Sequence, residues 1–307
     1  MRILRRDAAT SATAIAVGSF DGVHLGHQAM LARVREQAAR RSLVPAALTF
    51  EPLPREFFFG RAAPARLSSL GEKLSLLAAA GMAETFVERF DAQFAAITAG
   101  AFAERLARRY GARHVIVGPD FRYGARRQGD VESLRAAARI HGFEVEVMEP
   151  VLVDGTRVSS TRVREALAGA RFADAARLLG RTYGICGRVL HGAKRGRAMG
   201  FPTANVRLAR PRAPLSGIFA VKCFTAATRG LEGVASLGSN PALGPGGPET
   251  LEAFLFDFSG DLYGERLSIE FVKKLREEAA FASLEALAAQ IARDCDAARA
   301  HFRATRT

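Results

Sequence analysis

The stretch that decides the fold reads Val17-Gly18-Ser19-Phe20-Asp21-Gly22-Val23-His24-Leu25-Gly26-His27-Gln28. The apolar run from Ala14 to Val17 predicts a buried strand, and a helical pattern of apolar residues begins near His27. This predicts a strand–turn–helix unit, which directs backbone N–H groups and a helix N-terminus toward an anion. A helix that begins at His24 places both imidazoles on one side, because the histidines lie three residues apart. Two such donors suit a phosphate whose negative charge grows during displacement.

The histidine turn also carries a family resemblance. His24-Leu25-Gly26-His27 resembles the His-x-Gly-His signature of the nucleotidyltransferase superfamily, and the stretch from Gly18 to His27 resembles the bacterial bifunctional riboflavin kinase/FAD synthetase family. The alternative is a capped strand–helix turn with incidental histidines, since short motifs recur by chance. The resemblance implies that His24 and His27 are catalytic, and that the turn binds ATP through Gly18, Ser19, Phe20, Asp21 and Gly22.

Composition sets the broad class of protein. The chain has 307 residues, 49% of them hydrophobic, which favours two domains with packed cores. No apolar run reaches the roughly 18 residues of a membrane span, and the charged N-terminus lacks the apolar core of a signal peptide. Three scattered cysteines match neither a metal site nor a disulfide framework, so a cytoplasmic location is predicted.

The net charge of +13, from 44 basic and 31 acidic residues, raises the hypothesis of nucleic-acid binding. The arginines are dispersed on helical stretches such as residues 101–109 rather than gathered in one aromatic-interleaved stripe. Solvated helix faces are therefore the favoured interpretation. A basic nucleic-acid-binding or regulatory protein built on inherited folds stays open as the alternative from another functional class.

The first half alternates strands with helices. Predicted strands cover residues 44–50, 84–90, 114–118 and 143–148, and predicted helices cover residues 28–41, 68–80, 99–110 and 133–141. Such alternation predicts a parallel α/β sheet that binds ligands at the carboxyl ends of its strands.

An aromatic, proline-bearing segment stands at the end of the strand predicted at residues 44–50. Its sequence is Phe50-Glu51-Pro52-Leu53-Pro54, and the two prolines predict an extended loop. Phe57, Phe58 and Phe59, which come next, are core residues by default. In the family that the chain resembles, the matching loop lies beside the flavin, whose flat ring is well held by aromatic faces. The resemblance implies flavin-binding roles for Phe50, Pro52 and Pro54.

A second match to the adenylyltransferase part of the family is Val117-Gly118-Pro119-Asp120-Phe121-Arg122-Tyr123-Gly124. It implies that Asp120 and Phe121 bind flavin, whereas the alternative is a glycine-rich turn with a buried Phe121. Pro119 stands where the family usually has an acidic or polar residue, and proline removes one backbone donor.

A run of hydroxyl residues, Ser159-Ser160-Thr161, precedes an apolar-periodic segment and predicts a helix N-terminus. Arg162 and Arg164 bring guanidinium groups to the same helix start, where phosphate oxygens are favoured. The alternative is a well-capped surface helix. The run resembles the family's Ser-Ser-Thr-Arg-x-Arg motif, which implies that the triphosphate of ATP binds Ser160, Thr161, Arg162 and Arg164.

The sequence changes character after residue 182. Strand-like segments and glycines replace the Ala/Arg-rich helices, and several short strands around one core predict a small antiparallel barrel. The resemblance implies an FMN adenylyltransferase domain with a Rossmann-like nucleotidyltransferase fold at residues 1–182. It implies a riboflavin kinase domain, a six-stranded antiparallel β-barrel with a C-terminal helix, at residues 183–307.

Two glycine-flanked basic turns open the second half, and backbone amides of such turns can cradle phosphates. The hydroxyl of Thr203 and the amide of Asn205 are neutral oxygen ligands that suit Mg2+ together with nucleotide phosphates. Gly200-Phe201-Pro202-Thr203-Ala204-Asn205 resembles the riboflavin kinase signature. The resemblance implies Thr203 and Asn205 as metal ligands, and ATP-binding residues Gly192, Arg195, Gly196, Gly200 and Pro202.

Glu252 matches the base of the kinase family, where a carboxylate orients the attacking hydroxyl and accepts its proton. On an alternating strand it is otherwise most simply an outward-facing surface residue. The resemblance also implies that Arg276 contacts flavin. Residues 240–242 read Asn-Pro-Ala where the family usually has Arg-Pro-Thr.

The sequence thus predicts an enzyme that converts riboflavin to FMN with ATP and then transfers AMP from ATP to FMN, giving FAD and pyrophosphate. The predicted partners are riboflavin, FMN, FAD and ATP, with Mg2+ as cofactor, and neither nucleic acid nor membrane. We expect a monomer or a weak homo-oligomer. The departures at Pro119 and at residues 240–242 leave open the alternative that only one domain is active.

Overall fold

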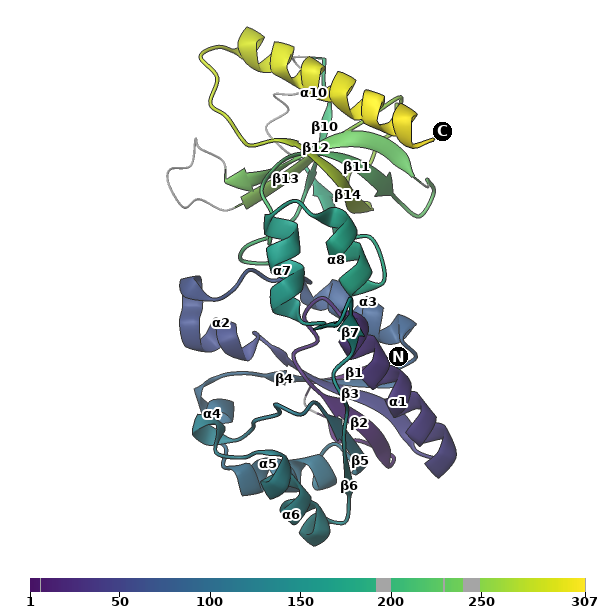
Figure 1. Ribbon diagram of the computed structural model, residues 1–307, viewed down its shortest axis with the longest axis vertical. Coiled ribbons are helices and arrows are strands. Elements are labelled where there is room, and N and C mark those ends of the chain that lie inside the picture. Colours follow the sequence, from purple (N-terminus) through teal and green to yellow (C-terminus); the bar gives the residue numbers. More distant parts are fainter. Residues whose placement is uncertain (6, 192–199, 229, 240–248, 307) are drawn as a thin grey trace. The chain divides into compact units, whose positions relative to one another are not determined.

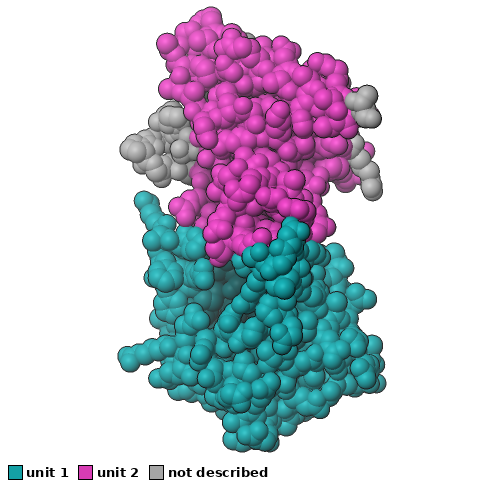
Figure 2. Space-filling model, viewed as in Figure 1, with its two compact units in different colours: residues 1–64, 70–159 teal, residues 65–69, 160–307 magenta. Residues whose placement is uncertain are grey.

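The structure, a computed structural model, describes residues 1–5, 7–191, 200–228, 230–239 and 249–306 (Figure 1). The chain forms two compact units, coloured separately in Figure 2. Unit 1 comprises Met1–Pro64 and Leu70–Ser159, and unit 2 comprises Ala65–Ser69 and Ser160–Thr307. The helices after Ser160 therefore group with the barrel, and the functional boundary near residue 182 stays a prediction.

Unit 1 is built on a six-stranded parallel sheet with the strand order β1-β4-β3-β2-β5-β6. The strands are β1 (Arg2–Leu4), β2 (Thr13–Val17), β3 (Val44–Glu51), β4 (Glu84–Arg89), β5 (Ala112–Val117) and β6 (Glu144–Val147). All residues of β2 are buried, as expected for a central strand covered on both faces. A two-stranded ribbon, β7 (Leu152–Val153) with β8 (Thr156–Arg157), follows the sheet.

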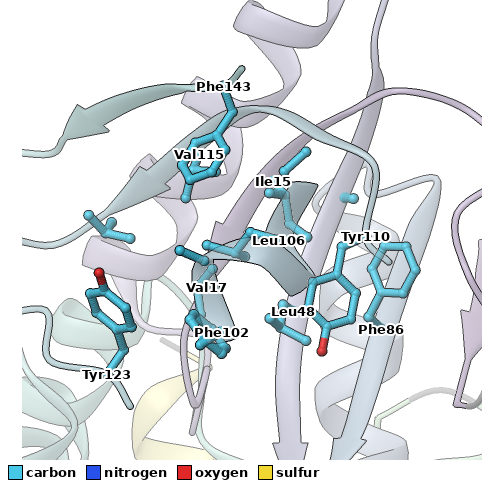
Figure 3. Close-up of a cluster of buried hydrophobic side chains, with 14 of the residues drawn as sticks. Ile15, Val17, Leu48, Phe86, Phe102, Leu106, Tyr110, Val115, Tyr123 and Phe143 are labelled. Carbon is cyan, nitrogen blue, oxygen red and sulfur yellow. The ribbon is translucent and has the colours of Figure 1, made fainter. Parts of the chain in front are cut away.

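Successive residues of β2 point into two different hydrophobic cores of unit 1, because successive side chains of a strand face opposite sides of the sheet. Ile15 and Val17 pack in the cluster that includes side chains of α5 and α6, drawn in Figure 3. Ala14 and Ala16 pack in the cluster that includes side chains of α1 and α3. The helices are α1 (Leu25–Arg41), α2 (Pro54–Phe59), η1 (Gly60–Ala62), α3 (Leu70–Ala79), α4 (Ala92–Ala95), α5 (Ala99–Arg108), η2 (Ala125–Arg127) and α6 (Val131–His141). The predicted Rossmann-like layering is confirmed.

The segment after β3 differs from the prediction of an extended loop. Pro54 begins α2, since a proline is preorganised for the first helical position. The Glu56 carboxylate accepts a hydrogen bond from the Leu53 N–H at 2.9 Å and closes the helix start. Phe57, Phe58 and Phe59 are 38%, 62% and 60% exposed, so their default interpretation as core residues is wrong.

Unit 2 contains a closed barrel with the strand order β10-β13-β12-β11-β14-β9, and every neighbouring pair is antiparallel. The strands are β9 (Gly184–Leu190), β10 (Thr203–Val206), β11 (Gly217–Phe224), β12 (Leu231–Ser239), β13 (Glu249–Leu255) and β14 (Arg266–Arg276). The helices among the described residues of the unit are α7 (Ser160–Ala168), α8 (Phe172–Leu179) and α10 (Leu284–Thr305). The predicted six-stranded barrel and its C-terminal helix are confirmed.

A short segment from early in the chain completes unit 2. Residues 65–69 belong to it, and the Leu67 carbonyl accepts hydrogen bonds from Arg210 Nη1 at 2.8 Å and from the Tyr183 hydroxyl at 3.1 Å. Arg210 is 8% exposed, so these carbonyl contacts satisfy donors that are largely shielded from water.

Candidate active sites

The turn between β2 and α1 is held in an unusual backbone conformation. Phe20 and Val23 have φ angles of +48° and +40°, in the left-handed region that non-glycine residues rarely adopt. Each such residue costs on the order of 1–3 kcal/mol and persists only where its surroundings fix it. Both side chains are fully buried, so the core holds the turn in this shape before any ligand arrives.

Hydrogen bonds tie the turn to β3 and to α1. The Gly18 N–H donates to the Leu48 carbonyl at 3.0 Å, and the Thr49 hydroxyl donates to the Ser19 carbonyl at 3.2 Å. At the other end, the Gln28 side-chain amide donates to the Val23 carbonyl at 2.9 Å. The predicted ATP-binding turn is therefore anchored at both ends.

The two predicted catalytic histidines lie together at the start of α1. The helix begins at Leu25, and His24 caps it by accepting the His27 N–H at its Nδ1, at 3.3 Å. Because Nδ1 accepts, the neutral ring carries its proton on Nε2 and presents a donor there. The rings stack with their centroids 3.7 Å apart, which confirms the prediction that both imidazoles face one side.

The His24 ring lies close to the backbone at Gly26 and leaves little room for a side chain there. A Cβ atom at this position would lie 3.2 Å from Cε1 and 3.3 Å from Nδ1 of His24. Any side chain there would press on the imidazole that caps the helix. The glycine therefore preserves both the cap and the histidine stack.

The electrostatic surroundings of His27 favour its uncharged form. Burial, the neighbouring His24 and the charge of Lys73 together hold the pKa of His27 well below its usual value. The edge of the Phe20 ring packs against His27, with a centroid distance of 5.2 Å. At neutral pH the His27 ring is consequently uncharged.

Three of the predicted flavin residues of unit 1 line two separate hollows. Pro52 lines a cleft of about 970 Å³ together with Phe94 and Arg105. Asp120 and Phe121 line a smaller hollow of about 350 Å³.

Two of the other predicted flavin residues serve as supports in the structure. Phe50 is buried, and its ring contacts Phe90 and Phe94 at centroid distances of 5.8 and 5.7 Å. Pro54 is the first residue of α2. Flavin contact by these residues stays a prediction.

Sequence reasoning missed the partner of Asp120. Arg157 forms an ion pair with its carboxylate, and both residues belong to unit 1. In the sequence, the feature that could have pointed to Arg157 is its position two residues before the hydroxyl run that starts at Ser159. Phe121 is partly buried and stacks on Tyr123 at 5.5 Å, which orders the loop that carries Asp120.

The predicted triphosphate motif lies at the beginning of α7, in unit 2. The helix begins at Ser160, inside the hydroxyl run that predicts a helix N-terminus, and Ser160, Thr161, Arg162 and Arg164 all fall in its first turns. The Arg164 Nε donates to the Ala65 carbonyl at 2.5 Å, so this guanidinium also anchors the segment 65–69 of the same unit.

The barrel brings the predicted kinase residues together. Asn205 of β10 lies directly opposite Glu252 of β13, and Thr203 lies two residues earlier on the same face. The Thr203 hydroxyl donates to the Glu252 carboxylate at 3.2 Å. All three side chains lie on the less buried face of their strands, which leaves the carboxylate accessible.

These oxygen donors fit a magnesium ion. Among the described residues, no group of three His, Cys, Asp or Glu side chains could hold a metal by itself. Thr203 and Asn205 supply hard, neutral oxygens, and Mg2+ is commonly bound by few protein ligands, with phosphates and water completing its shell.

Arg276, the predicted flavin residue of the barrel, is held by a residue that sequence reasoning missed. Its guanidinium makes a two-pronged ion pair with Asp294 of α10, at 2.8 to 3.1 Å, and Phe281 lies 5.6 Å away. Asp294 is 5% exposed, beside the buried Cys295. An acidic residue within an apolar helix stripe was the available signal.

Part of the predicted kinase site lies outside the described residues. Gly192, Arg195 and Gly196 are in this category, as are residues 240–242, where the chain departs from the family pattern. Gly200 and Pro202 are described and exposed.

Comparisons with known proteins assign the chain to a family. The family model described as FAD synthetase matches residues 6–162, and the model described as riboflavin kinase matches residues 179–302. A bifunctional riboflavin kinase/FMN adenylyltransferase from Pseudomonas fluorescens is 46% identical over 285 residues, which cover 92% of this chain and 91% of that protein. The chain belongs to the bifunctional riboflavin kinase/FMN adenylyltransferase family.

Other comparisons agree with this membership. The Escherichia coli K12 protein of the same name is 43% identical over 293 residues, covering 95% of this chain and 93% of that protein. A solved structure described as a macrolide-efflux protein from Streptococcus pneumoniae aligns with a TM-score of 0.78 and 27% identity, covering 96% and 97% of the two chains. Among the helices that the structure describes, none combines the length and apolar character needed to cross a bilayer.

Membership of the riboflavin kinase/FMN adenylyltransferase family divides the candidate sites between the two matched segments. The histidine pair and its turn fall in the FAD synthetase match, whereas Thr203, Asn205 and Glu252 fall in the riboflavin kinase match. Each matched segment therefore has its own candidate reactive centre.

Proposed function

We propose that this protein phosphorylates riboflavin to FMN with ATP, and then transfers AMP from ATP to FMN to form FAD and pyrophosphate. The observation that carries the proposal is the stacked, helix-capping His24–His27 pair in the segment matched to FAD synthetase. The Thr203–Glu252 contact in the barrel supports the kinase half.

Adenylyl transfer is assigned to the histidine turn. A phosphate oxygen of FMN attacks the α-phosphorus of ATP, and the bond to the pyrophosphate breaks. The attacking oxygen is already anionic, so the step needs positioning and charge stabilisation rather than a strong base. His24 donates from Nε2, and His27 adds a second N–H donor to the phosphate charge that develops in the transition state.

Riboflavin phosphorylation is assigned to the barrel. Glu252 orients the 5′-hydroxyl and accepts its proton as the oxygen bonds to the γ-phosphorus, and ADP departs. Thr203 and Asn205 would hold Mg2+, which neutralises phosphate charge when it is bound. The Thr203 hydroxyl, in contact with Glu252, also fixes the carboxylate beside the substrate.

We assign the first reaction of this pathway to residues 183–307 and the second to residues 1–182. The proposed partners are riboflavin, FMN, FAD and ATP, in a cytoplasmic monomer or weak homo-oligomer that binds neither nucleic acid nor membrane.

A product assay tests the proposal. Purified protein is incubated with riboflavin, ATP and Mg2+, and the flavins are separated by chromatography with fluorescence detection. FMN should appear first and FAD after it. A second incubation starts from FMN, and FAD there without FMN formation in the first would mean that only the adenylyltransferase is active. No product in either incubation would overturn the enzyme assignment.

A further inference from the structure

Lysine is placed selectively in this chain. Lys73 is the sole lysine among the first 193 residues, in which all other permanently basic side chains are arginines. Lysine carries a compact ammonium on a flexible stem, whereas arginine carries a wide planar fork. A lone lysine in an arginine-rich segment therefore marks a position where the smaller cation fits.

Lys73 is also completely buried. It lies on α3 with 0% exposure, although lysine is almost never fully buried without a partner. Withdrawing an ammonium from water is costly unless hydrogen bonds and charges compensate it. Its position inside unit 1 is consequently a specific feature of the fold rather than an incidental one.

Hydrogen bonds connect Lys73 with the turn before α1. Its Nζ donates to the Thr49 hydroxyl at 3.2 Å, and that hydroxyl donates to the Ser19 carbonyl at 3.2 Å. Thr49 is itself fully buried on β3. Lys73 thus fixes the hydroxyl orientation that holds Ser19, the residue before the strained Phe20.

The same ammonium acts on the histidine pair. Its charge is one of the three causes that keep the pKa of His27 low, after burial and the stacked His24. Phe20, which follows Ser19, packs its ring on His27. The buried Lys73 ammonium therefore acts on this site in two ways. It holds the turn through the Thr49 hydrogen bonds, and its charge lowers the pKa of His27.

We propose that Lys73 is a positioning residue for adenylyl transfer, which holds the Gly18–Gly22 turn through Thr49 and places a buried positive charge beside the His24–His27 pair. The inference rests on the adenylyl transfer proposed above for this site. The turn keeps its N–H groups oriented for phosphate, and His27 stays a neutral donor.

The test combines two variants with a control. Lys73→Met keeps the length of the side chain and removes the ammonium, whereas Thr49→Val removes only the hydroxyl. Lys222→Met makes the same chemical change on an exposed position of the barrel strand β11. Riboflavin kinase activity of each full-length variant reports correct folding of the barrel, and histidine-ring NMR spectra report the folding of unit 1.

Both variants should lower kcat for FAD formation from FMN by about ten- to a hundredfold, as misplaced reactive groups do. Only Lys73→Met should move the His27 ring titration to higher pH, because only it removes the neighbouring charge. Lys222→Met should change neither quantity. A Lys73→Met protein whose kcat and His27 titration both match the wild type would reduce Lys73 to a packing residue and overturn the inference.

A measurement on the wild-type protein covers the case in which Lys73→Met does not fold. The ¹⁵Nζ resonance of Lys73 should shift as His27 titrates, and a resonance that ignores this titration overturns the inference. The NMR titrations need no turnover. Wild-type protein that makes no FAD would therefore refute the proposed function while the coupling of Lys73 to His27 is still measured.

Discussion

His24 in unit 1 is 7% exposed and caps a helix, whereas Glu252 in the barrel lies on the less buried face of its strand. The surroundings of the histidines are set by the fold itself, through a buried lysine, a stacked ring and a strained turn. Among the described residues, the Thr203 hydroxyl donates a hydrogen bond to the Glu252 carboxylate. The histidine pair is therefore surrounded by buried groups, whereas the Glu252 carboxylate lies on the accessible face of its strand.

The comparison predicts its largest effect for Glu252→Gln. Loss of the base should lower the rate of FMN formation from riboflavin by about 10²- to 10⁴-fold, because the hydroxyl proton loses its acceptor. FAD formation from added FMN should stay at the wild-type rate. Initial rates of the two reactions, measured separately, check this expectation, and an equal loss in both would contradict independent sites.

His27→Ala should have the next largest effect, in the opposite reaction. Removing one preorganised donor should slow FAD formation from FMN by about 10²- to 10³-fold and leave FMN formation intact. His141→Ala, on the last turn of α6, is the matched control and should retain both rates. Loss of kinase activity in His27→Ala protein that remains folded would break the comparison.

Within the barrel, Asp294→Ala should lower the free energy of unfolding by about 1–3 kcal/mol, because Arg276 loses a largely buried counter-charge. Urea unfolding of the full chain, followed in the barrel, measures the change. Glu277→Ala removes an exposed partner of Lys274 and should cost much less. An equal decrease in the free energy of unfolding in the two variants would show that burial does not determine how much these ion pairs stabilise the protein.

The smallest expected effect is a pH dependence of stability in unit 1. The unfolded chain binds a proton on His27 near pH 6.5, whereas the folded protein binds it only well below that value. The neutral His27 ring therefore contributes its full stabilisation above pH 6.5, and this contribution falls as the pH drops toward the pKa of His27 in the folded protein. The free energy of unfolding of wild-type and His27→Gln protein, plotted against pH, should have the same slope above pH 6.5. Below pH 6.5, only the wild type should show the additional loss of stability that comes from His27.

The sequence was sufficient for the elements whose periodicity is strong. The buried run of β2, the start of α7 at Ser160 and the alternation around Glu252 all follow from local patterns. The Glu252–Asn205 register could not be derived from residues alone, because it depends on pairing between strands far apart in the chain. The family resemblance, rather than any local pattern, placed them at one site.

Other features were missed for physical reasons that can be named. The sequence predicts a loop at Pro54 because proline both ends and begins helices, whereas in the structure the Glu56 carboxylate closes a helix start there. Lys73, Arg157 and Asp294 act through partners distant in sequence, so their roles appear only in three dimensions. Hydrophobicity alone predicts that Phe57 to Phe59 are core residues, although a six-residue helix at the surface carries them.

The segment 65–69 has a consequence for protein engineering. Because it precedes most of unit 1 in the chain yet belongs to unit 2, a single cut after Ser159 cannot release both units intact. A barrel fragment that starts at Ser160 would leave Arg210 and Tyr183 without the Leu67 carbonyl that they share. A separately expressed kinase half therefore needs residues 65–69 grafted onto it. The two units are not consecutive in the sequence, because part of unit 2 lies between two parts of unit 1.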